Sequence, residues 1–350
     1  MHCEIAAVEF LCKFAGVIWY FVGVSVILRG RLVGNGSSAK LSNVMEKFQL
    51  HILGCGSATP TVRHFPSAQV LTLRGKSYMV DCGEGAQLQL RRCRIGFASI
   101  NHIFISHLHG DHCFGLMGLI STFALHGRPT DLHVYSPAGL REVLQPQIDY
   151  FCRGMSFQVV FHEVPTDRSE EVFSDSALRV TTIPLQHRVP TCGYLFCEQP
   201  GLPHIRRDMI DFLGIPHYAI MGIKEGGGWT TDDGRVFSHE QLTVPARPPR
   251  AYAYVSDTLF CPRCAELIRG VDLLFHESTF AESDAARAVE TNHSTAMQAA
   301  RMAELAGATR LVIGHFSSRY DDEDLLLAEA RSVFPHTERA AETRVFDIGE

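Results

Sequence analysis

The chain has 350 residues, of which 46% are hydrophobic and 20% are charged, and its formal net charge is −6 at pH 7. A chain of this length and apolar content can bury a substantial core, as one large domain or two small ones. The negative balance excludes an overall nucleic-acid signature, so an RNA partner would have to contact local basic patches. The 11 cysteines follow no disulfide framework, which favours buried, reduced thiols in a cytosolic protein.

Residues 1–44 differ in pattern from the rest of the chain. The apolar run at 14–28 falls short of the roughly 20 residues that span a bilayer. Glu4 and Glu9 interrupt the basic region that a signal peptide needs, and no convincing cleavage site follows. We interpret 1–44 as an extension outside the fold, either a weak hydrophobic anchor or an artefact of the start site with translation beginning at Met45. We favour the artefact.

From residue 48 onward, short apolar runs bounded by glycine and polar residues predict a strand-rich domain. The expected strands are 48–53, 70–73, 77–80, 132–135 and 157–161. The second and third of these flank Arg74-Gly75-Lys76, which predicts a hairpin. We expect helices at 116–125 and 322–333, and a third from the capping box Thr295-x-x-Gln298 to Gly307.

The stretch Ser106-His107-Leu108-His109-Gly110-Asp111-His112 follows the apolar run 103–105, which predicts a buried strand. The loop at the end of a strand is a common place for functional residues. His107 and His109 can bind one ion, and Asp111 and His112 then face a second. Imidazole and carboxylate suit Zn²⁺ in an open, catalytic geometry. A histidine-rich surface loop without metal does not account for this spacing after a strand.

Four later apolar strands each deliver one polar residue at their end: 178–183 precedes His187, 251–255 precedes Asp257, 272–275 precedes Glu277, and 311–313 precedes His315. We therefore predict two zinc sites. His107, His109 and His187 would bind one ion, Asp111, His112 and His315 the other, and Asp257 would bridge them. Two zinc ions about 3.5–4 Å apart activate a shared water and suit in-line hydrolysis of a phosphodiester.

Three residues are candidates for proton transfer. Asp111 could orient the attacking water or accept its proton. His293, with Glu277 fixing its tautomer, is a candidate acid for the leaving oxygen. Helix capping is the alternative role for His293, which lies just before the helix at 295.

Residues 199–250 are rich in proline and glycine and too long for an ordinary connection, so they are either disordered or functional. We interpret them as a protruding arm with a short helix at 205–213. Arg206, Arg207 and Lys224 could contact phosphates there, and Arg91, Arg92 and Arg94 form a second basic cluster. A solvated charged face explains either cluster equally well.

The pair Cys261-Pro-Arg-Cys264 has no second C-x-x-C partner, as a structural zinc site would require. We interpret it as incidental, with a redox or metal role as the weaker alternative.

Together these motifs resemble the ribonuclease Z family, the tRNA 3′-processing endonucleases of the metallo-β-lactamase superfamily, in their short bacterial-type form. The resemblance runs from about residue 45 to near residue 350. It rests on Asp81-Cys82-Gly83-Glu84-Gly85-Ala86-Gln87, Ser106 to His112, Pro184-Leu185-Gln186-His187, Ser256-Asp257-Thr258, His276-Glu277-Ser278-Thr279-Phe280, His293-Ser294-Thr295, and Gly314-His315-Phe316-Ser317-Ser318-Arg319-Tyr320.

The resemblance implies an α/β protein with a metallo-β-lactamase-type αββα sandwich over 45–350, two zinc ions per subunit, and the inserted arm at about 199–250. It implies a cytoplasmic homodimer with no membrane contact for this domain, in which the arm reaches over the partner subunit and grips the tRNA body. Cleavage after the discriminator nucleotide would leave a 3′-hydroxyl on the tRNA and a 5′-phosphate on the trailer. Asp111 corresponds to the family's proton acceptor.

The chain departs from the family pattern in the arm, where Leu213-Gly214-Ile215-Pro216 is followed by His217-Tyr218-Ala219 instead of a Gly-Pro pair. Another substrate of the same centre, such as a small phosphodiester, a sulfate ester or a thioester, is therefore the alternative enzymatic function. An inactive metal-binding scaffold is a further alternative, but the complete ligand set argues against it. A di-iron oxidoreductase would be expected to carry a carboxylate in place of His109.

Overall fold

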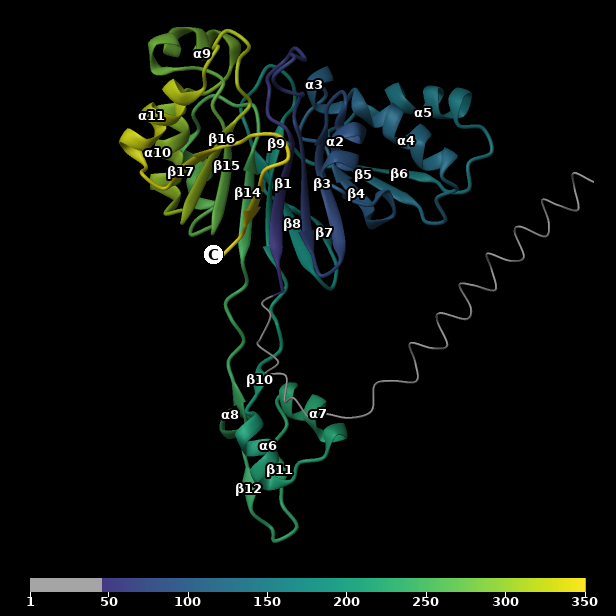
Figure 1. Cartoon of the computed structure of the whole chain (residues 1–350), viewed down its shortest axis with the longest axis vertical. Coiled ribbons are helices and arrows are strands. Elements are labelled where there is room, and N and C mark those ends of the chain that lie inside the picture. The colour runs from purple at the N-terminus through teal and green to yellow at the C-terminus, as the bar shows by residue number, and fades with distance from the viewer. Residues whose placement is uncertain (1–45, 350) are drawn as a thin grey trace, which may run out of the picture. The chain divides into compact units, whose positions relative to one another are not determined.

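The computed structural model describes residues 46–349, so the expectation for residues 1–44 lies outside the described part of the chain. Two seven-stranded sheets form the centre of this domain, and helices lie on their outer faces (Figure 1). The predicted α/β class and αββα sandwich are therefore confirmed. Among residues 46–349, no helix is long and apolar enough to cross a membrane.

The first sheet has the strand order β18-β1-β2-β3-β4-β5-β6. Its strands are β1 (Phe48–Gly54), β2 (Ala68–Leu73), β3 (Lys76–Cys82), β4 (Ile100–Phe104), β5 (Leu132–Ser136), β6 (Val159–Glu163) and β18 (Val345–Asp347). The helices of this half are α2 (Ala86–Arg92), α3 (Gly110–Cys113), α4 (Gly115–Leu125) and α5 (Leu140–Phe151), with the 3₁₀ turn η1 (Phe97–Ser99).

The second sheet has the order β17-β16-β15-β14-β9-β8-β7. Its strands are β7 (Glu171–Ser174), β8 (Leu178–Pro184), β9 (Cys192–Glu198), β14 (Ala251–Val255), β15 (Leu273–Glu277), β16 (Arg310–Gly314) and β17 (Thr337–Arg339). The helices of this half are α9 (Ala285–Thr291), α10 (Ala296–Ala306) and α11 (Asp324–Val333), with the turns η3 (Pro262–Glu266) and η4 (Glu282–Asp284).

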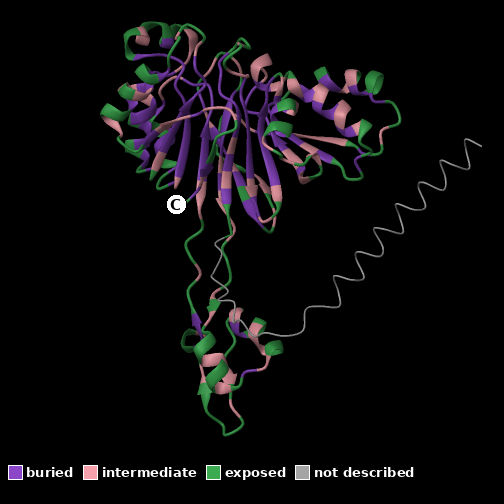
Figure 2. Ribbon diagram, viewed as in Figure 1, coloured by how far each residue is buried: buried purple, intermediate pink, exposed green. Residues whose placement is uncertain are grey.

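Strand alternation explains why two apolar layers form. In β3, Tyr78 and Val80 belong to the core between the sheets, whereas Met79 belongs to the core beneath α4. In β4, Phe104 faces the first core and Ile103 the second. Because side chains of a strand alternate between the two faces, a strand covered on both sides is apolar throughout. Burial accordingly follows the strands and the inner faces of the helices (Figure 2).

The arm is folded rather than structureless. It holds β10 (His204–Ile205), α6 (Arg207–Leu213), η2 (His217–Ala219), α7 (Ile220–Lys224), β11 (Trp229–Thr230), β12 (Val236–Phe237), α8 (His239–Leu242) and β13 (Thr243–Val244). Ile215, Ile223 and Leu242 form its own small core. The helix expected at 205–213 begins two residues later, because Ile205 pairs with Thr243 in a short β-ladder.

The other expected elements lie within a few residues of their observed positions. Thr295 caps α10 through the predicted capping box with Gln298, and Gly307 ends the helix in the left-handed conformation. The strand expected at 157–161 instead occupies Val159–Glu163. Phe157 lies just before the strand and is buried in the core beneath α4 and α5. Its apolar side chain therefore made residue 157 look like the first residue of the strand.

Phe104 joins the two sheets through aromatic contacts. Its ring centroid lies 5.5 Å from that of Tyr194 and 5.4 Å from that of Phe196, both on β9 of the opposite sheet. We expect Phe104→Ala to lower the free energy of unfolding by about 3–5 kcal/mol, because it leaves a cavity between the sheets. Thermal and urea unfolding followed by circular dichroism measure this. Phe151→Ala on α5, where the side chain is 65% exposed, should stay within about 0.5 kcal/mol, and equal losses in both variants would contradict the assignment.

Candidate metal centre

Both sheets deliver polar residues to one edge of the sandwich. Strands β3, β4 and β5 run parallel in the first sheet, and β14, β15 and β16 run parallel in the second, so their carboxyl ends share an edge in each sheet. The loop after β4 and the short helix α3 carry His107, His109, Asp111 and His112, while the second sheet supplies His187, Asp257, Glu277 and His315. The structure brings all of these predicted residues together.

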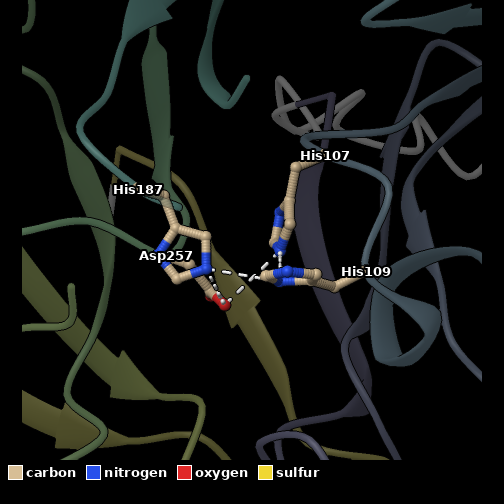
Figure 3. A group of neighbouring side chains, drawn as sticks. All are labelled: His107, His109, His187 and Asp257. Carbon is tan, nitrogen blue, oxygen red and sulfur yellow. Dashed lines mark hydrogen bonds and ion pairs between the residues drawn. The ribbon is translucent and has the colours of Figure 1, made fainter. Parts of the chain in front are cut away.

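The first group holds three imidazoles and one carboxylate (Figure 3). Nε2 of His107 lies 3.1 Å and Nε2 of His187 lies 3.3 Å from Nδ1 of His109. Oδ2 of Asp257 lies 3.5 Å from Nε2 of His107 and 3.9 Å from Nε2 of His187. His109 therefore presents its Nδ1 atom, whereas the other two histidines present Nε2.

The second group shares Asp257 with the first. Nε2 of His112 lies 3.3 Å from Nε2 of His315, and both lie within 3.5 Å of Oδ2 of Asp111. Oδ1 of Asp257 lies 3.3 Å from Nε2 of His315, and its Oδ2 lies 3.5 Å from Nε2 of His112. Asp257 thus lies between the two groups, as expected for a bridging ligand.

The donor set fits divalent cations. Ring nitrogens that face one another at 3.1–3.3 Å direct lone pairs at a common point unless one of them is protonated. Burial, reinforced by His112, lowers the pKa of His107 well below its usual range, which favours the neutral imidazole that binds metal. Within the described residues, Oδ1 of Asp257 is buried without a hydrogen-bond partner. A bound cation would satisfy this oxygen.

Asp81, the penultimate residue of β3, orients two of these histidines from the first sheet. Its Oδ2 accepts hydrogen bonds from Nδ1 of His112 at 2.7 Å and from the hydroxyls of Ser106 and Tyr254 at 2.9 and 2.6 Å. Oγ of Ser106 in turn accepts from Nδ1 of His107 at 3.0 Å. Asp81 is fully buried and has a left-handed backbone with φ of 53°, a strained conformation that is typical of functional sites.

In the sequence, Asp81 is recognisable only as the first residue of the motif Asp81-Cys82-Gly83-Glu84-Gly85. The signal available was a carboxylate at the end of an otherwise apolar strand, the same signal that identified Asp257 and Glu277. Gly83, two residues later, allows the backbone at Asp111 to approach closely, since a Cβ on residue 83 would lie 2.5 Å from the carbonyl oxygen of Asp111.

Glu277 plays the corresponding part in the second sheet. Its Oε1 accepts from Nδ1 of His293 at 3.1 Å, and its Oε2 accepts from the hydroxyl of Thr279 at 2.7 Å. Oγ1 of Thr279 then accepts from Nδ1 of His315 at 2.9 Å. Burial opposes protonation of His293, but the charge of Glu277 and the hydrogen bond from His293 to Glu277 outweigh it. Together they raise the pKa of His293 to about 9.

The ligands open onto a cavity of about 530 Å³. Its wall combines His109, His187 and His293 with the loop residues Ser57 and Ala58. The backbone amide of Ala58 donates to Oδ2 of Asp111 at 2.7 Å. A residue of a different loop therefore helps to orient the Asp111 carboxylate. The cavity therefore gives a substrate direct access to both metal-ligand groups.

Curated relatives match almost the whole described domain. Ribonuclease Z from Bacteroides fragilis strain YCH46 is 58% identical over 298 residues, which are 85% of this chain and 98% of that protein. Ribonuclease Z from Phocaeicola vulgatus is 55% identical over 304 residues, 87% of this chain and 98% of that protein. The chain belongs to the ribonuclease Z family.

Solved structures agree with this membership of the ribonuclease Z family. Human tRNase Z, short form, superposes with a TM-score of 0.64 at 27% identity, over 86% of this chain and 100% of that chain. The metallo-β-lactamase fold protein YhfI from Bacillus subtilis gives 0.61 at 18% identity, over 86% of this chain and 99% of that chain, and supports the fold alone. A family model described as anti-Pycsar protein Apyc1 matches residues 48–199, which end at the root of the arm.

The cysteine pair interpreted as incidental lies near this centre. Cys261 and Cys264 are both buried, with their Sγ atoms 2.9 Å apart, and Sγ of Cys264 donates to the carbonyl oxygen of Pro184 at 3.1 Å. Pro184 ends the strand that leads to His187. The incidental role of the pair stays a prediction.

Asp81 should matter for metal affinity although it is not a ligand. Asp81→Asn replaces an acceptor oxygen by an amide, so His112 and Ser106 lose their fixed orientation, and we expect metal affinity to fall about 10–100-fold. Competition with a graded metal chelator measures it. Asp175→Asn is the matched control, because Asp175 also accepts from a tyrosine hydroxyl, that of Tyr78, but lies outside the centre. Unchanged affinity in Asp81→Asn would refute the positioning role.

Proposed function

We propose that this chain is a zinc-dependent endoribonuclease that removes 3′ trailers from tRNA precursors, cutting after the discriminator nucleotide. The observation that carries the proposal is the double ligand group around Asp257 at the mouth of the cavity, in a chain of the ribonuclease Z family. The solved relative at 27% identity is a tRNase Z. The nuclease domain would comprise residues 45–350 with the arm at 199–250, acting in the cytoplasm.

His107, His109 and His187 would hold one Zn²⁺, Asp111, His112 and His315 a second, and Asp257 would bridge them. Imidazole and carboxylate oxygen are ordinary zinc ligands, and all of them here are buried or half-buried. When bound, two such ions supply a nucleophile at neutral pH and charge stabilisation at the phosphate. Asp81 fixes the tautomer of His112 directly and of His107 through Ser106, and Glu277 fixes that of His315 through Thr279.

Asp111 would accept the proton of the attacking water. Its side chain is 10% exposed on the cavity side, and the Ala58 amide and His315 hold its Oδ2. His293 would donate a proton to the leaving 3′ oxygen of the tRNA, since the Glu277 carboxylate keeps its imidazole protonated at neutral pH. The products would be a tRNA 3′-hydroxyl and a trailer 5′-phosphate.

The attachment of the arm supports action as a homodimer. The arm leaves after Glu198 and returns at Arg250, at one end of β9 and β14 (Figure 1). His187 precedes β9 and Asp257 follows β14, so both lie at the opposite ends of these strands. At about 3.3 Å per residue, the five residues of β14 alone separate the arm root from Asp257 by roughly 17 Å. An arm rooted so far from its own centre is suited to hold tRNA bound at the centre of a second subunit.

The arm can contact RNA by both charge and stacking. Arg207 is exposed, while Arg206 is engaged with Asp208 at 3.0 Å and contributes less free charge than the sequence suggested. Phe212 and Tyr218 are 74% and 83% exposed, and aromatic rings of this kind stack on bases or riboses. These side chains would replace the grip of the missing Gly-Pro pair.

The direct test is cleavage of a 3′-extended tRNA precursor by the zinc-loaded full chain, with both product ends mapped. We expect one cut after the discriminator nucleotide and a 5′-phosphate on the trailer.

Asp257→Ala should abolish cleavage and lower the zinc content, because it removes the ligand common to both groups. Asp149→Ala, on the exposed face of α5, is the matched control. Full activity with normal zinc in Asp257→Ala would refute the bridging role.

The arm can be removed without disturbing its root, because Glu198 and Arg250 pair across adjacent strands, with Nε of Arg250 2.9 Å from Oε2 of Glu198. Replacing residues 199–249 by an Asn-Gly turn should close a β9–β14 hairpin. We expect kcat/KM for the precursor to fall about 10²-fold or more through lost phosphate contacts. Hydrolysis of bis(p-nitrophenyl) phosphate should persist, whereas equal loss on both substrates would mean that the arm supports the fold.

A further inference from the structure

A second cluster of ligand-type side chains lies outside the metal centre that contains Asp257. Cys55 follows β1, His64 lies on the loop that ends at Pro66, and Glu342 lies between β17 and β18. One ligand atom of each residue lies within 4.8 Å of the others. None of the three belongs to the ligand set or the proton-transfer residues assigned above, so the cluster needs its own explanation.

The spacing of the three ligand atoms is that of a metal site. Sγ of Cys55 lies 3.4 Å from Nδ1 of His64 and 3.7 Å from Oε1 of Glu342, and Nδ1 of His64 lies 3.1 Å from Oε2 of Glu342. Ligands at the usual zinc distances of about 2.0–2.3 Å in a tetrahedron are separated from one another by roughly 3.3–3.6 Å. The observed triangle therefore needs only small shifts to enclose an ion.

The backbone is built to bring Cys55 and His64 together. The amide of Gly56 donates to the carbonyl oxygen of Phe65 at 3.0 Å, which pairs the two arms of the loop. A Cβ on Gly56 would lie 2.9 Å from Cβ of His64, so only glycine permits this approach. The close contact of thiol and imidazole is thus a feature of the loop's backbone.

We propose that Cys55, His64 and Glu342 bind a divalent cation of the zinc type, separate from the ions at Asp257. A thiolate, an imidazole and a carboxylate suit a borderline-soft cation such as Zn²⁺. Thiolate and carboxylate together neutralise its two positive charges, so the occupied site carries little net charge into a buried environment. The side chains of His64 and Glu342 are 15% exposed and give the ion a path of entry.

The surroundings of the cluster match those of known metal ligands. Nε2 of His64 lies 3.1 Å from Oε1 of Glu323, an outer carboxylate that fixes Nδ1 as the metal-binding atom. The amide of Phe65 donates to Oε1 of Glu342 at 2.9 Å, which orients the ligating carboxylate. Arg63 lies 3.3 Å from Glu323 and holds that outer carboxylate in turn.

An ion here would tie the loop at the mouth of the cavity to the C-terminal segment. Residues 55–66 include Ala58, whose amide orients Asp111, and Pro66, which lines the cavity. Glu342 precedes β18, the edge strand beside β1. The proposal does not depend on the substrate of the enzyme, because it rests on residues outside the catalytic ligand set.

Cobalt distinguishes the two kinds of site, because no ligand assigned to the centre at Asp257 is a cysteine. The full chain, stripped of metal with a chelator, is titrated with Co²⁺ under anaerobic conditions. We expect a near-ultraviolet charge-transfer band from thiolate to cobalt, which grows with one ion per chain, in addition to the visible bands of cobalt bound by histidine and carboxylate. Absence of the near-ultraviolet band in the unmodified chain would overturn the proposal without any variant.

Two cysteine variants assign the band. Cys55→Ser should lose it while keeping the visible bands, which also report that the variant is folded. Cys261→Ser is the matched control and should keep it, because Cys261 is a buried thiol 2.9 Å from Sγ of Cys264 and belongs to neither group of ligands. Loss of the band in Cys261→Ser, or its survival in Cys55→Ser, would place the thiolate elsewhere and leave the cluster as an ion pair of protonated His64 with its glutamates. Glu342→Gln should weaken Co²⁺ binding at this site at least tenfold.

Discussion

Two buried carboxylates, one at the end of a strand in each sheet, control the geometry of the metal centre. Asp81 fixes His112 directly and His107 through Ser106, and Glu277 fixes His293 directly and His315 through Thr279. A neutral imidazole offers a lone pair on only one nitrogen, so the partner of the other nitrogen decides which atom faces the metal. Without these two carboxylates, the histidines would be present but not preorganised.

This arrangement depends on the packing of the two sheets. The carboxylates and their histidines lie at strand ends, so their mutual distances are set by the aromatic and aliphatic core between the sheets, which includes Phe104 and Phe196. The hydroxyl of Tyr254 crosses this core from β14 to reach Asp81 on β3 at 2.6 Å. A polar contact of this kind joins the sheets at the same level as the ligands and couples the stability of the core to the geometry of the centre.

That the proposed ligands lie together could be predicted from the sequence, because each follows a recognisable apolar strand, as His315 follows 311–313. The role of Asp81 could not, since it depends on contacts with residues 25 and 173 positions away. Helix α5 was not predicted, because Pro146 in its interior is a residue that normally ends or kinks a helix. The cluster at Cys55 could not be predicted either, because Glu342 lies 287 residues from Cys55 and no local sequence pattern connects them.

The arm shows how a small subdomain can be stable only in its context. Its core of Ile215, Ile223 and Leu242 is too small to offset the conformational entropy of some fifty ordered residues, as small cores generally are. The chain compensates at the root, where Glu198 accepts from Arg250 and from Arg74. A root held by half-buried charge pairs ties the start and the end of the arm to β9 and β14. The loops at the opposite ends of β9 and β14 carry His187 and Asp257, so the arm and the candidate metal centre are attached to the same pair of strands.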